Sequence, residues 1–205
     1  MIFEMEDLVR YPLKDQNYNK HKSDGTIVMK KFLKELLSTV IYLVVIFLLT
    51  FLFITFVMQR TEVSGQSMEP TLQDGDSLLI EKVSYRFSSP KRFDIIVFPY
   101  QYGNDQFFIK RIIGFPGESI RIDYDGNIYV DGELLEENYG AEIIIDPGRA
   151  ETEVVLGEDE FFVMGDNRNH SMDSRDISVG SIHKSDIIGR AFVRIYPFSK
   201  FGSIR

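Results

Sequence analysis

The sequence predicts a mainly β fold class, with one N-terminal transmembrane helix ahead of an antiparallel, barrel-like β-rich domain. Residues 36–58 form an uncharged apolar run, whereas residues 59–205 contain short apolar runs separated by Gly, Pro, Asp and Asn. Short apolar runs bounded by turn residues are typical of strands, and no segment after residue 58 combines helical period with helical length. We therefore expect a tail at 1–35, a transmembrane helix at 36–58 and one domain at 59–205.

The apolar run at 36–58 is long enough to cross a bilayer. Twenty-three helical residues reach about 34 Å, against roughly 30 Å for a hydrocarbon core. A cleaved secretory signal is the alternative, but the run is longer than the apolar part of such a signal, and no small-x-small cleavage site follows it. A buried helix of a soluble protein would carry charges on one face, and this run carries none.

Basic residues flank the run unevenly, and this asymmetry predicts its orientation. Five lysines lie between residues 20 and 34, whereas only Arg60 follows the run closely. Loops that carry an excess of Lys and Arg stay on the cytoplasmic side of a membrane. We therefore expect residues 1–35 in the cytoplasm and residues 59–205 outside the cell membrane.

Eight segments after the run are predicted to be strands. The dipeptides Asp125-Gly126 and Asp131-Gly132 between them are typical of hairpin turns. Residues 123–127 also resemble part of a calcium loop, but the glycine comes too early and no glutamate closes the frame, so a turn is expected and no metal site. The predicted strands are 77–82, 94–98, 107–114, 119–124, 128–130, 154–156, 161–164 and 187–196.

The composition excludes several kinds of site and partner. The chain has no cysteine, which excludes disulfides, thiolate metal sites and a cysteine nucleophile. Its formal net charge is −8, and residues 59–205 hold 16 Lys and Arg against 25 Asp and Glu. An acidic domain of this kind argues against nucleic acid as a partner.

Ser67 is a candidate nucleophile because of its place in the chain. It lies only nine residues beyond Met58, and nine extended residues reach at most about 30 Å, so the serine is expected close to the membrane surface. A serine hydroxyl is a poor nucleophile until a neighbouring base removes its proton. A turn serine before Pro70 is an alternative interpretation of the same residue.

Two kinds of base are available to such a serine. Beyond the span the only histidines are His170 and His183. Neither has an acidic residue at a spacing that would indicate a Ser-His-Asp triad. A lysine can replace histidine when burial keeps it uncharged, and Lys110 follows Phe107-Phe108-Ile109 in a predicted strand. The pattern alone is equally compatible with a lysine that points outward from an alternating strand.

Four separated segments resemble the type I (leader) signal peptidases, which are membrane-bound serine–lysine proteases. The likeness covers most of residues 36–205, and the single span and short domain look most like Gram-positive members. The SxxK signature of penicillin-binding proteins is absent after Ser67. The four segments are SMEPTL at 67–72, GDSLLIEK at 75–82, KRIIGFPGE at 110–118 and GDNRNHSMDSR at 165–175.

The resemblance implies a role for each matching residue. Ser67 would be the nucleophile, Lys110 the general base, and Ser171 the hydroxyl that orients the lysine. The substrates implied are preprotein signal peptides with small residues at −1 and −3, and no cofactor is implied. A salt-bridged scaffold would comprise Asp173, Arg175 and Arg111. Shallow apolar pockets would be lined by Val63, Met68, Leu72, Phe108 and Ile109.

One departure and two alternatives accompany the resemblance. Some members have a serine two positions before the nucleophile that donates to the oxyanion, and this chain has Gly65 there. Self-cleaving serine–lysine proteins related to SOS repressors share the chemistry, but the span and the lack of a basic helix argue against them. A membrane-anchored β module that binds peptides without cutting would be expected to lack Ser67 or Lys110, and both are present.

Overall fold

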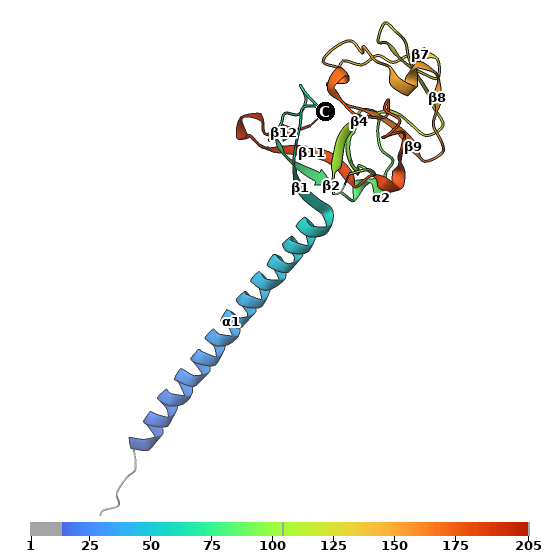
Figure 1. The fold of residues 1–205 in the computed structure, drawn as a ribbon. Helices are drawn as coiled ribbons and strands as arrows, with labels where there is room; N and C mark the ends of the chain where they lie inside the picture. Colours follow the sequence, from blue (N-terminus) through green and yellow to red (C-terminus); the bar gives the residue numbers. More distant parts are fainter. Residues whose placement is uncertain (1–13, 104, 205) are drawn as a thin grey trace, which may run out of the picture. The chain divides into compact units, whose positions relative to one another are not determined.

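The computed structural model describes residues 14–103 and 105–204, with side chains described for 28–53, 57–85, 87–103 and 105–204. The chain divides into two units, 1–51 and 52–205. The described residues of the first unit are helical, and the described strands all belong to the second (Figure 1). The fold class expected from the sequence, one apolar helix and a mainly antiparallel β domain, is confirmed.

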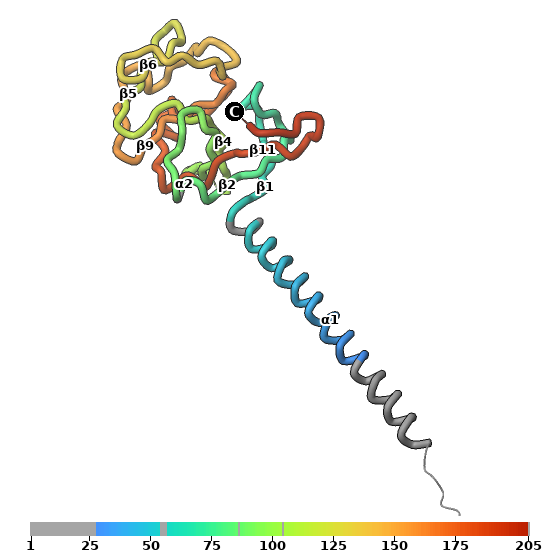
Figure 2. Tube along the Cα trace, turned by 180° about the vertical axis from the view of Figure 1, so that it is seen from behind, coloured from blue at the N-terminus to red at the C-terminus, as the bar shows by residue number. Residues whose placement is uncertain are grey.

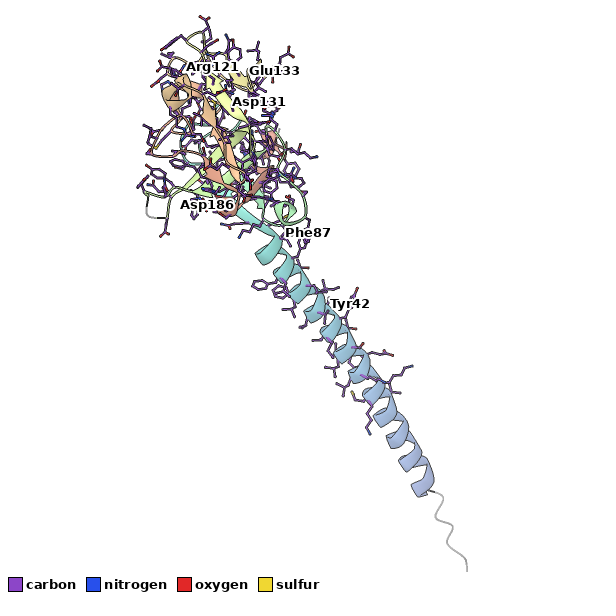
Figure 3. All side chains as sticks on the ribbon, turned by 90° about the vertical axis from the view of Figure 1, so that its right-hand side faces the viewer. Tyr42, Phe87, Arg121, Asp131, Glu133 and Asp186 are labelled. Carbon is purple, nitrogen blue, oxygen red and sulfur yellow. The ribbon has the colours of Figure 1, made fainter. Side chains whose placement is uncertain are left out.

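The helix α1 runs over Lys14–Val57, 44 residues in all. Its segment Val28–Phe53 is long and apolar enough to cross a membrane. Side chains of this segment, Tyr42 among them, project outward from the helix (Figure 3). The helix begins well before residue 36, because polar residues can form the same backbone hydrogen bonds as apolar ones. The limits of the membrane span, expected at 36–58, stay a prediction.

Eight strands of the second unit form the larger sheet, in the order β1-β2-β11-β3-β4-β9-β10, with β12 paired to β11. Every pairing in this sheet is antiparallel. The strand β1 begins directly after the last residue of α1 and pairs with β2, so the chain enters the larger sheet as soon as the helix ends. The strands are β1 (Met58–Glu62), β2 (Ser77–Glu81), β3 (Ile95–Pro99), β4 (Phe107–Gly114), β9 (Glu160–Met164), β10 (Ile182–His183), β11 (Gly189–Tyr196) and β12 (Gly202–Ser203).

The smaller sheet has the order β7-β6-β5-β8 and forms a lobe of its own, drawn at the top of Figures 1 and 2. Its strands are β5 (Ser119–Ile122), β6 (Ile128–Val130), β7 (Glu133–Leu134) and β8 (Val154–Val155). Gly126 and Gly132 both have positive φ angles, of 83° and 81°, as the two predicted hairpin turns require. The Asp123 carboxylate accepts hydrogen bonds from Asp125, Asn127 and Tyr129, which confirms a turn at this position.

The central strands are buried on both faces. In β3, Ile95 and Val97 pack into one apolar cluster with Leu72, whereas Ile96 and Phe98 pack into another. This double burial explains why 95–98 is a continuous apolar run in the sequence. A third cluster joins the small lobe to β4 and β9. A short helix, α2 (Ser84–Phe87), and four short 3₁₀ segments connect the strands.

Candidate active site

The loop that carries Ser67 connects β1 to β2 and is closed by hydrogen bonds at its base. The N–H of Val63 donates to the Asp76 carbonyl at 2.8 Å, and the N–H of Gly75 donates to the Val63 carbonyl at 2.9 Å. Met68 and Leu72 from this loop are buried in the apolar cluster below it. The two buried side chains hold Ser67 on a fixed turn at the domain surface.

Lys110 of β4 reaches Ser67. Its Nζ lies 2.7 Å from Ser67 Oγ and 3.1 Å from the Ile109 carbonyl, to which it also donates. The side chain is 3% exposed, and Nζ lies 5.0 Å from the centre of the Phe108 ring. The outward-facing interpretation of Lys110 is therefore wrong, because the strand places this lysine in the interior beside the serine.

Burial lowers the pKa of Lys110 from 10.5 to about 8, and the carboxylates of Asp173 and Asp166 oppose this effect by raising it. A lysine with this pKa has a substantial neutral fraction near neutral pH, whereas an ordinary lysine has almost none. The neutral amine carries a lone pair that can accept a proton from the hydroxyl 2.7 Å away. The pair therefore has the geometry that an activated serine needs, and the lowered pKa makes the neutral form of the lysine accessible.

The structure does not bring either histidine into such a pair. His183 is on β10, where its Nε2 lies 3.7 Å from Glu160 Oε1. His170 lines the cleft that contains Ser67, but no hydrogen bond joins it to the serine within the described chain. Among the described residues, the fold places Lys110, and neither histidine, within hydrogen-bond distance of the Ser67 hydroxyl.

Two buried ion pairs surround the lysine. Arg111 donates through Nε and Nη2 to both oxygens of Asp166, at 2.8 and 2.7 Å. Arg175 donates in the same two-pronged way to Asp173, at 2.9 and 2.8 Å. All four side chains are buried, so each charge depends on its partner, and removing one of them would leave an uncompensated charge.

Gly165 allows the loop at 165–175 to approach Ser67. A Cβ on this residue would collide with Ser171 Oγ and with the carbonyl oxygen of Ser67. Ser171 therefore lies close to the serine, but its hydroxyl is buried and has no hydrogen-bond partner within the described chain. The expected hydrogen bond from Ser171 to Lys110 is not formed in this structure, and its orienting role stays a prediction.

Ser67 and Lys110 open into a cleft of about 510 Å³. Val63, Met68, Phe108 and Ile109 line it as expected. Leu72 does not lie among the described lining residues, because it is fully buried in the apolar cluster under the loop. Two backbone edges also line the cleft: β1 is the edge strand of its sheet, and 107–110 of β4 pairs only with β3 among the described strands.

Comparisons with known proteins agree with this geometry. A family model described as "Signal peptidase, peptidase S26" matches residues 34–196. The chain is 42% identical over 154 residues to a probable signal peptidase I-2 of Synechocystis sp., covering 72% of this chain and 67% of that protein. The chain belongs to the signal peptidase family.

Further relatives carry similar names. A probable signal peptidase I-1 of Synechocystis sp. is 38% identical over 85% of this chain and 88% of its own length. Signal peptidase IB of Staphylococcus aureus is 30% identical over 82% of this chain and 93% of its own length. A crystal structure of a signal peptidase I from Enterococcus faecalis is 31% identical, covers 50% of this chain and 97% of that chain, and has a TM-score of 0.41.

Family membership confirms the resemblance drawn from the four motifs. The protein is a serine endopeptidase that cleaves signal peptides, anchored in a membrane by the apolar segment of α1. A peptide-binding module without activity is not favoured by this assignment.

Sequence reasoning missed two residues of this signal peptidase site. Asp166 lies in the matched segment 165–175, yet its partnership with Arg111 was not expected. Thr71, in the loop that carries Ser67, donates from Oγ1 to Asp166 Oδ2 at 2.5 Å. The Asp166 carboxylate also accepts from Arg111, so it joins this loop to β4, the strand of Lys110. The only signal was the place of Asp166 in a matching segment, because nothing local in the sequence indicates a contact across 55 residues.

Proposed function

We propose that Ser67 is the nucleophile and Lys110 the general base of this signal peptidase. The 2.7 Å contact between Lys110 Nζ and Ser67 Oγ carries the proposal, because it joins a hydroxyl to an amine whose pKa burial lowers. We also propose that Ser171, Asp173, Arg175 and Arg111 support this pair. The contacts of Asp173 and Arg175 around Gly165 support that role.

The reaction then has two steps. Lys110 accepts the Ser67 proton while Oγ attacks the scissile carbonyl carbon, and the resulting ammonium gives that proton to the leaving amine as the C–N bond breaks. The mature protein leaves with a new N-terminal amine, and the signal peptide stays bound to Ser67 as an ester. Water then attacks the ester carbonyl with Lys110 as its base, so that the signal peptide leaves as a carboxylate and the serine regains its proton.

Replacing either member of the pair is expected to remove nearly all turnover. Ser67→Ala and Lys110→Ala should each abolish cleavage of a preprotein by the detergent-solubilised full chain, with product mass read by mass spectrometry. Residues that act as a unit give non-additive losses, so the double variant should be no worse than either single one. His170→Ala and His183→Ala are the controls and should keep most activity. A folded but inactive histidine variant would contradict the proposal.

Activity is expected to rise with pH through the pKa of Lys110. This pKa is lowered to about 8, and only the neutral amine accepts the serine proton, so activity is lost as pH falls below that value. Roughly a tenth of the lysine is neutral at pH 7 and about nine tenths at pH 9. Initial cleavage rates measured from pH 5 to 9 test this, and a flat profile between pH 5 and 8 would count against a lysine base.

We further propose that the N-terminal residues face the cytoplasm and the β domain lies outside. The lysines between residues 20 and 34 support this orientation, since cytoplasmic flanks carry an excess of basic residues. Protease added to intact spheroplasts should digest the region beyond Met58 and spare the N-terminal tail. Ruptured spheroplasts are the control, in which both regions should be digested. Protection of the β domain in intact spheroplasts would reverse the orientation.

We propose that the substrate binds in extended form along the two strand edges that line the cleft. Alternate side chains of an extended peptide point the same way, so residues −1 and −3 would both face the enzyme. Val63 and Met68 are buried, and Phe108 and Ile109 are half-buried. Because little of these four apolar side chains is exposed, the surface that they offer to the substrate is shallow and suits alanine. A larger group would collide with them.

Substrate selection at −1 follows from this arrangement. A preprotein with Ala-x-Ala should be cut after the second alanine, whereas Phe or Lys at −1 should block cleavage. Exclusion by collision discriminates more strongly than the loss of one methylene contact, which is worth only about 1–3 kcal/mol. Preproteins that differ only at −1 provide the measurement, and equal cleavage rates for Ala and Phe would show that these residues do not form the specificity pocket.

A further inference from the structure

Asn167 makes two hydrogen bonds to the nucleophile loop that none of the roles above uses. Its side-chain Nδ2 donates to the Gln66 carbonyl at 3.1 Å. Its backbone N–H donates to the Ser67 carbonyl, also at 3.1 Å. One residue therefore holds the peptide group before Ser67 and the peptide group after it.

The peptide group between Gln66 and Ser67 is the important one, because it contains the Ser67 N–H. The Gln66 carbonyl accepts a second hydrogen bond from the Glu69 N–H at 3.1 Å, which closes a turn around Ser67. In a trans peptide the carbonyl and the N–H point in opposite directions. A carbonyl fixed by two donors therefore fixes the direction of the Ser67 N–H, which donates to no acceptor within the described residues.

This peptide group lies between two hollows of the surface, and Gln66 lines both of them. Gln66 and Asn167 line a groove of about 400 Å³ together with Glu69 and Pro70. Ser67 and Lys110 line the larger cleft, as Gln66 also does, whereas Asn167 is not among the described residues that line it. The Gln66 carbonyl points toward its donor Asn167, which lines the groove and not the cleft. The Ser67 N–H on the opposite side of the peptide group is therefore directed away from the groove, which we take to be toward the cleft where the scissile carbonyl would sit.

We propose that Asn167 is a positioning residue that aims the Ser67 N–H at the oxyanion formed during acylation. The inference rests on the proposed role of Ser67 as nucleophile. Gly65 makes this orientation more important, because it brings no side-chain hydroxyl and its own N–H donates to Asp74 Oδ1 at 2.7 Å. That N–H is therefore occupied, whereas the Ser67 N–H is free to donate to substrate.

Asn167 is itself held firmly enough to act in this way. The preceding residue, Asp166, is fully buried between Arg111 and Thr71. The carbonyl of Asn167 accepts the His170 N–H at 3.0 Å. These contacts anchor the backbone on both sides of Asn167, and the anchored backbone places its side chain beside the Gln66 carbonyl.

The test is kinetic and uses the detergent-solubilised full chain with one preprotein substrate. Asn167→Asp keeps the size of the side chain and the backbone N–H but removes the donor to the Gln66 carbonyl. Removing a whole oxyanion donor lowers kcat by about 10²–10³-fold, and a donor that stays but loses its orientation should cost roughly 10–100-fold. KM and the ascending pH limb near 8 should not change, because Asn167 makes no hydrogen bond to Lys110 in the described chain.

Asn169→Ala is the matched control. Asn169 lies two residues further along, and its side chain donates to Glu142 and to the Ile143 carbonyl, away from the nucleophile loop. This variant removes hydrogen bonds of the same kind from the same segment and should keep kcat near that of the unmodified protein. Thermal unfolding of each variant shows whether the fold is kept, and Asn167→Ala provides a second variant if Asn167→Asp does not fold.

A second readout separates orientation of the donor from general damage to the site. A peptide aldehyde ending in alanine forms a tetrahedral adduct with a serine hydroxyl and creates an oxyanion-like oxygen, whereas the matching peptide alcohol does not. Asn167→Asp should weaken binding of the aldehyde by about the factor lost in kcat and leave binding of the alcohol unchanged.

Two results would overturn the positioning role. One is an unchanged kcat in both folded Asn167 variants, and the other is a loss that falls entirely on KM or moves the pH limb. A wrong assignment of Ser67 as the nucleophile gives a different result, because the Ser67→Ala variant would then retain activity. An inactive Ser67→Ala together with a fully active Asn167→Asp would remove only the positioning role.

Discussion

The desolvation of one lysine is the interaction on which the site depends. Lys110 is almost completely buried and has no carboxylate as a hydrogen-bond partner in the described chain, so its amine can lose its proton near neutral pH. Asp173 and Asp166 lie near enough to raise its pKa, but each is held in a two-pronged pair with an arginine. The arginines reduce the negative potential that the carboxylates would otherwise exert on the lysine. The scaffold therefore supplies structure near the base without holding it charged.

The segment at 165–175 joins the parts of the site that lie far apart in the chain. Asp166 binds both Thr71 of the nucleophile loop and Arg111, the neighbour of the base. Asn167 binds both peptide groups that flank Ser67. Gly165 has no side chain, and only this lets the segment lie against Ser67. A loop holds site residues in fixed positions only when the side chains that attach it to the domain are themselves buried. The apolar clusters on the two faces of β4 and β9 provide that burial.

The sequence predicted the central strands well because their burial is visible in their composition. The run 95–98 is apolar at every position, and the structure buries it on both faces. The edge strand β1 (Met58–Glu62) was missed because its polar sequence, Met-Gln-Arg-Thr-Glu, carries no strand pattern, and its register depends on pairing with β2. The prediction that Leu72 lines the cleft is wrong, because its closeness to Ser67 in the sequence does not show whether its side chain faces the cleft or the core. Only the four-motif resemblance gave the roles of Ser67 and Lys110.

The open strand edges of the cleft connect the fold to the proposed mode of substrate binding. An unpaired strand edge is a site for unwanted association, and charged residues such as Arg60 and Glu62 on β1 reduce that risk. The same edge can receive any extended peptide through its backbone, since backbone hydrogen bonds do not depend on side-chain identity. An enzyme that binds its substrate in this way can accept signal peptides of different sequence and still require small side chains at the few positions that face its apolar wall. If the substrate binds as proposed, broad tolerance of sequence and a strict choice at −1 and −3 would have one structural cause.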